Sequence, residues 1–111
     1  MNYLHGEQIA RTWQQMPLEA QLGNIGSEYE RVMRAKFNNQ PERFSSALDR
    51  MLELFDLTLA DRRWKGPKLK ELCRAREIAC AEIYGDKEFG GNPDGLKKYF
   101  LQFATLARTK I

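Results

Sequence analysis

The chain has 111 residues and a formal net charge of +3, a length that suits a single domain. Hydrophobic residues make up 42% and charged residues 30%, which is typical of a globular domain and unlike a disordered chain. No apolar stretch approaches the roughly 20 residues of a membrane helix, and the first residues lack the basic and apolar segments of a secretory signal, so we expect a cytoplasmic protein without a membrane partner.

Apolar residues recur at helical spacing almost throughout, and no segment alternates with the period of a strand. The first expected helix is short and covers residues 5–15, and the second covers residues 18–37. The apolar positions of the second helix continue through Gly23 and Gly26. Each glycine costs about 1 kcal/mol inside a helix, so either a neighbouring helix crosses closely there or the helix kinks.

Three more helices follow. The third is expected over residues 42–62, and the fourth over 67–84 after a break at Gly66. The last begins near Asn92 and Pro93 and carries apolar residues to about Ala107. Four long amphipathic helices joined by short turns predict an all-α fold, an antiparallel four-helix bundle with a short additional N-terminal helix, and one domain over residues 1–111.

The two cysteines, Cys73 and Cys80, lie on the expected fourth helix. Seven residues of helix separate their Cα atoms by about 10.5 Å. This is more than the roughly 7 Å that a disulfide tolerates, so the two thiols cannot bridge each other. Because they lie two turns apart on the expected inward face, we predict two buried, reduced thiols.

The sequence contains few residues that could bind a metal ion or a cofactor, and we expect neither. There is one histidine, His5, and no Glu-x-x-His pair for a di-metal bundle. The segment from Asp86 to Lys97 resembles a calcium loop, with Gly91 at its sixth position. Lys97, however, occupies the twelfth position, where calcium needs a bidentate glutamate, so an ordinary interhelical loop is favoured.

The pattern also indicates a protein that is not an enzyme. A serine nucleophile would have to recruit His5, the single candidate imidazole. The pair Gly23 and Gly26 lacks the Lys-Ser/Thr of a phosphate-binding loop and follows no strand.

Positive charge is concentrated in residues 61–80, which hold seven basic and three acidic side chains. Clustered cations bind phosphates, and an exposed aromatic ring can stack on single-stranded bases. Trp64 lies among these cations, although it could instead close the end of the bundle, while the cations complement the helix carbonyls. The candidate nucleic-acid-binding residues are Arg62, Arg63, Trp64, Lys65, Lys68, Lys70 and Arg74.

Aromatic residues make up 11% of the chain, more than one small core is expected to bury. The aromatic residues left outside the predicted apolar seams are Trp13, Phe37, Tyr84, Phe89 and Tyr99. Aromatic side chains outside a core often mark interfaces. We therefore expect a non-enzymatic helical-bundle protein that acts through protein–protein contacts, either with itself as a homodimer or with another protein. The alternative is a nucleic-acid-binding accessory protein that uses residues 62–76.

Overall fold

The computed structural model describes residues 6–84, and their side chains from residue 11 onward. This part of the chain is mostly helical and contains four helices and no strand. Their bounds are α1, Gly6–Gln15; α2, Leu18–Phe37; α3, Pro41–Leu59; and α4, Gly66–Tyr84. The helix expected over residues 92–107, the loop over 86–97, and the candidate residues Phe89 and Tyr99 lie outside the described residues.

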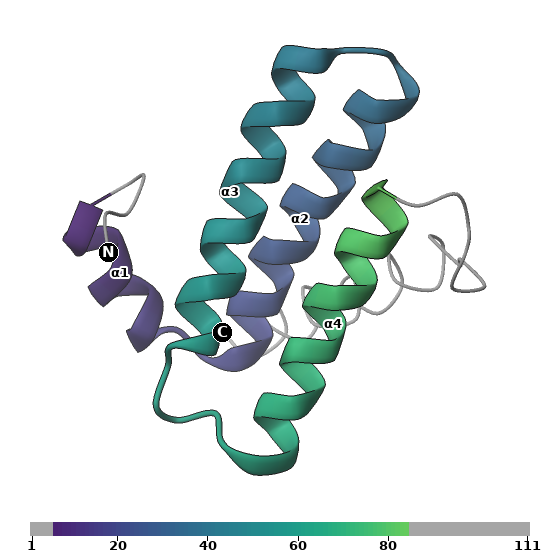
Figure 1. Ribbon diagram of the computed structural model, residues 1–111. Helices are drawn as coiled ribbons and strands as arrows, with labels where there is room; N and C mark the ends of the chain where they lie inside the picture. The colour runs from purple at the N-terminus through teal and green to yellow at the C-terminus, as the bar shows by residue number, and fades with distance from the viewer. Residues whose placement is uncertain (1–5, 85–111) are drawn as a thin grey trace.

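Helices α2 and α3 form the centre of the described part and lie side by side along their length (Figure 1). The turn between them is tight. Asn39 adopts a φ of 51°, the left-handed region that asparagine tolerates better than most residues. The backbone N–H of Gln40 donates to the carbonyl of Ala35 at 2.9 Å, and Pro41 then starts α3 with a φ suited to a first turn.

The other two helices pack on this central pair. Helix α1 contacts α3, whereas α4 contacts both α3 and α2 and lies on the other side of the pair in the view of Figure 1. Between α3 and α4 the chain reverses at Gly66. Its φ of 57° is accessible to glycine at little cost.

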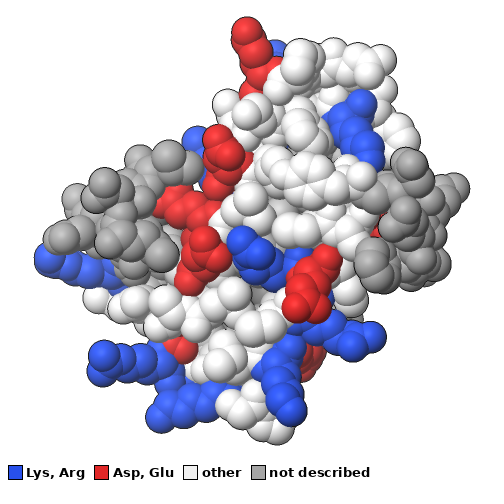
Figure 2. All heavy atoms as spheres, viewed as in Figure 1, with Lys and Arg blue, Asp and Glu red and all other residues white. Residues whose placement is uncertain are grey.

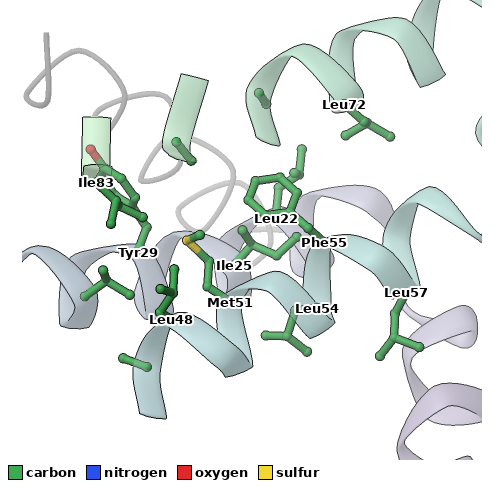
Figure 3. Packing of buried hydrophobic residues seen from close by; sticks show 14 of the residues in the cluster. Leu22, Ile25, Tyr29, Leu48, Met51, Leu54, Phe55, Leu57, Leu72 and Ile83 are labelled. Atoms are coloured by element: carbon green, nitrogen blue, oxygen red, sulfur yellow. The ribbon is translucent and has the colours of Figure 1, made fainter. Parts of the chain in front are cut away.

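The hydrophobic core lies between α2, α3 and α4, and its centre is drawn in Figure 3. Ile25 and Val32 of α2 and Met51 and Phe55 of α3 are fully buried. Helix α4 adds a stripe of inward residues, namely Leu72, Ala75, Ala79 and Ile83. Because burial of one large apolar side chain contributes about 1.5–3 kcal/mol, this shared core is what holds the three long helices together.

The continuity of α2 was predicted correctly. One helix runs from Leu18 to Phe37, and it includes Gly23 and Gly26, both of which are buried. The predicted bounds of the fourth helix also agree with α4 within one residue. The third helix was predicted too long, since α3 ends at Leu59 rather than at residue 62.

Two predictions about burial were wrong. Trp13 was expected outside the core, but only 5% of it is exposed, because α1 folds onto α3 and places the indole inside. Cys73 was expected to be buried, but it is exposed, and Cys80 is half-buried. The inward stripe of α4 passes through Leu72 and Ala79, and a residue one position further is rotated by about 100° away from the core.

Burial raises the pKa of the Cys80 thiol, since a charged thiolate is poorly solvated there. Both cysteines are free. Among the described helices, none combines the length and the apolar character that crossing a lipid bilayer requires.

Candidate functional site

A buried polar cluster connects α1, α2, α3 and the α3–α4 loop. It begins at Trp13, whose indole Nε1–H donates to Thr58 Oγ1 at 2.8 Å. Thr58 is fully buried, so this bond satisfies a polar atom that water cannot reach. The bond fixes α1 on the C-terminal half of α3.

Gln21 lies at the centre of the cluster, and its side chain is fully buried. Its Nε2 donates to the carbonyl of Trp13 at 2.8 Å and to Asp61 Oδ2 at 3.1 Å. Its Oε1 accepts from the indole of Trp64 at 3.1 Å. One amide side chain of α2 therefore joins α1 to the loop that follows α3.

Asp61 and Arg63 complete the cluster. The guanidinium of Arg63 donates to both carboxylate oxygens of Asp61, through Nε at 3.0 Å and Nη2 at 2.7 Å. Nη2 also donates to the carbonyl of Met16 at 2.6 Å. The hydrogen bonds from Arg63 hold the pKa of Asp61 below its usual value, despite the burial of the carboxyl group.

Two of the predicted nucleic-acid-binding residues, Arg63 and Trp64, belong to this cluster. Trp64 is half-buried, and the guanidinium of Arg63 lies 4.6 Å from the centroid of its ring. Such a contact is a cation–π interaction. Trp64 and Arg63 thus contact each other within the fold, and the Trp64 indole N–H is bonded to Gln21.

The remaining five candidate cations are exposed. They lie in the α3–α4 loop and the first turns of α4, and they are Arg62, Lys65, Lys68, Lys70 and Arg74. Lys68 forms an exposed ion pair with Glu71 at 3.8 Å, an interaction worth little in water. Figure 2 shows Lys and Arg side chains along the lower rim of the molecule, where Figure 1 places this loop and the start of α4.

Two of the predicted interface aromatics are strongly exposed, Phe37 by 74% and Tyr84 by 66%. They are the last residues of α2 and α4. The two helix ends are joined directly, because Lys36 Nζ donates to the carbonyl of Ile83 at 2.6 Å. The structure therefore brings Phe37 and Tyr84 to the same end of the described part.

A further feature was not predicted from the sequence. Four arginines line a groove between α2 and α3, namely Arg31, Arg34, Arg43 and Arg50. Residues 1–40 are balanced in charge and residues 41–60 are net negative, so a charge count along the chain gives no sign of it. One feature of the sequence could have indicated it. Arg43 and Arg50 lie seven residues apart, and this spacing places them on one face of α3.

The described residues hold no group of three or more His, Cys, Asp or Glu side chains arranged to bind a metal ion. No known protein family matches this chain, and no curated protein or solved structure is significantly similar to it.

From the polar cluster we predict how Asp61→Asn changes the free energy of unfolding. Because the pKa of Asp61 is lower in the folded than in the unfolded chain, its ionised form stabilises the fold. This contribution is complete above about pH 5 and is lost as the pH falls through the folded-state pKa. At pH 7 the substitution should lower the free energy of unfolding by about 1–3 kcal/mol, toward the lower end because Arg63 is partly solvated.

Urea unfolding between about pH 3 and pH 7 measures this effect, and the difference between wild type and variant should shrink toward the acid limit. Asp49→Asn is the matched control, since Asp49 is an exposed residue of α3. Equal losses of stability in the two variants, or no loss in either, would contradict the role given to Asp61.

Proposed function

We propose that this chain is a non-enzymatic helical protein that acts through protein–protein contacts and associates with a second copy of itself. The observation that carries the proposal is the pair Phe37 and Tyr84, two large aromatic side chains that are mostly exposed at one end of the described part. Exposed aromatic side chains that lie close together often mark a surface for protein–protein contact. A closed two-fold pairing is the commonest way to cover such a patch.

The short first helix is not the cover of this patch. Helix α1 is held at the other end of α2, where Gln21 donates to the carbonyl of Trp13. From Leu18 to Phe37, α2 spans about 28 Å at 1.5 Å per residue. Helix α1 therefore lies away from Phe37 and Tyr84, and in this proposal a second copy of the chain covers them.

The non-enzymatic part of the proposal rests on how the polar cluster is used. The hydrogen bonds of Gln21 join α2 to Trp13 and to the α3–α4 loop, and Arg63 joins that loop to Met16. The bonds between Arg63 and Asp61 lie within the loop and hold its shape. The lowered pKa of Asp61 therefore serves stability in this account, and an ion pair of that kind is a common structural cause of such a shift.

The dimer is tested by light scattering at tens of micromolar protein. The wild type should show twice the monomer mass of 12.9 kDa. The double variant Phe37→Glu, Tyr84→Glu should shift to the monomer mass, because each protomer would have to bury two carboxylates in the apolar contact.

Ile78→Glu is the matched control. Ile78 is an exposed apolar residue of α4 at 40%, and six residues of helix rotate it by about 120° from Tyr84. A wild type that scatters at 12.9 kDa, or a control that dissociates as fully as the double variant, would contradict self-association through the Phe37–Tyr84 end.

A second candidate function is nucleic-acid binding, which the five exposed cations of the α3–α4 loop and α4 favour. Because Trp64 is engaged with Gln21 and Arg63, binding would rest on phosphate contacts and depend little on base sequence.

Titration of a short labelled DNA at several salt concentrations tests this second candidate. The affinity should fall steeply with salt, and Lys68→Gln, Lys70→Gln, Arg74→Gln combined should reduce the slope of log K against log salt by about 3. Absence of binding near 50 mM salt, or a slope unchanged by the three substitutions, would reject it.

A further inference from the structure

The groove between α2 and α3 has the composition of an anion-binding site. It has a volume of about 550 Å³ and lies between the C-terminal half of α2 and the N-terminal half of α3. Its lining residues are Glu28, Arg31, Arg34, Ala35, Gln40, Glu42, Arg43, Ser46, Ala47 and Arg50. Four of these side chains are arginines and two are carboxylates, so the groove is positively charged as a whole.

Glu28 organises two of the arginines. It is buried, with 7% of the residue exposed, and accepts a hydrogen bond from Arg31 Nη1 at 2.8 Å. Arg50 Nη1 of α3 lies 3.7 Å from the same carboxylate oxygen. One buried carboxylate of α2 thus draws a guanidinium from each helix toward the same place.

The other two arginines are available to a ligand. Within the part of the chain that the structure describes, neither Arg34 nor Arg43 forms an ion pair or a side-chain hydrogen bond, and both are exposed. They come from different helices and line the same groove. Arginine offers planar, paired N–H donors that match phosphate and carboxylate oxygens, and Ser46 adds a hydroxyl to the lining.

The size and the charges of the groove narrow the class of ligand. Its volume lies in the range of small-molecule sites, about 300–1,000 Å³. The carboxylate of Glu42 also lines the groove and lowers its net positive charge. We propose that this groove binds a small phosphomonoester through Arg34 and Arg43, with Arg31 and Arg50 held beside it by Glu28.

The proposal is independent of the dimer and of the α4 cations, since it uses none of their residues. It is tested on the full chain by calorimetric titration with inorganic phosphate and with glucose 6-phosphate, at constant ionic strength set by sodium chloride. Saturable binding of either probe is expected. Tighter binding of glucose 6-phosphate would further assign the space beside the arginines to the organic part of the ligand.

Variants then locate the site. Arg34→Gln and Arg43→Gln should each weaken binding by about tenfold, because each removes a charge-assisted contact. Glu42→Gln should strengthen it severalfold by removing a repulsive charge. Arg11→Gln, an exposed arginine of α1, should leave the affinity unchanged.

Lysine variants separate a loss of the contact from a loss of folding, and circular dichroism of every variant checks that it is folded. Arg34→Lys and Arg43→Lys keep the charge and lose the paired donors, so they should bind with intermediate affinity. Two results would overturn the proposal: heats that do not saturate and match those of sodium chloride, or an equal loss of affinity in Arg11→Gln and in the groove variants.

Discussion

A buried amide must have its hydrogen bonds satisfied, and in this protein that constraint on Gln21 fixes the arrangement of one whole end. Its side chain bonds to the backbone of α1, to Asp61 and to Trp64. Loss of any one partner would leave a polar group in a place that water cannot reach. The position of α1 and the path of the α3–α4 loop are therefore set together, and the apolar core beside them fixes the three long helices.

The sequence predicted the helices well because helical periodicity is a local property of the chain. It did not predict the role of Trp13, whose burial depends on Thr58, a residue 45 positions away. The engagement of Arg63 is similar, since its partner Met16 lies in another element. The arginine groove was missed for the same physical reason, because α2 and α3 bring together charges that are dispersed along the chain.

The polar cluster, the exposed cations, the aromatic pair and the arginine groove lie in different places on the described part. The cluster around Gln21 closes the end where α1 packs, and the exposed cations lie nearby on the loop and on α4. The aromatic pair lies at the far end of α2, where Lys36 joins α4. The groove occupies the α2–α3 face and carries paired and unpaired arginines side by side.

The most direct test of this account is hydrogen exchange of the Trp13 indole N–H, followed by nuclear magnetic resonance. If the cluster fixes α1 to the core, this proton exchanges about as slowly as the most protected core amides, because both require global unfolding. Rapid exchange of the Trp13 indole, while the amides of Ile25 and Phe55 stay protected, would contradict the account. It would show that α1 detaches from the helices on its own.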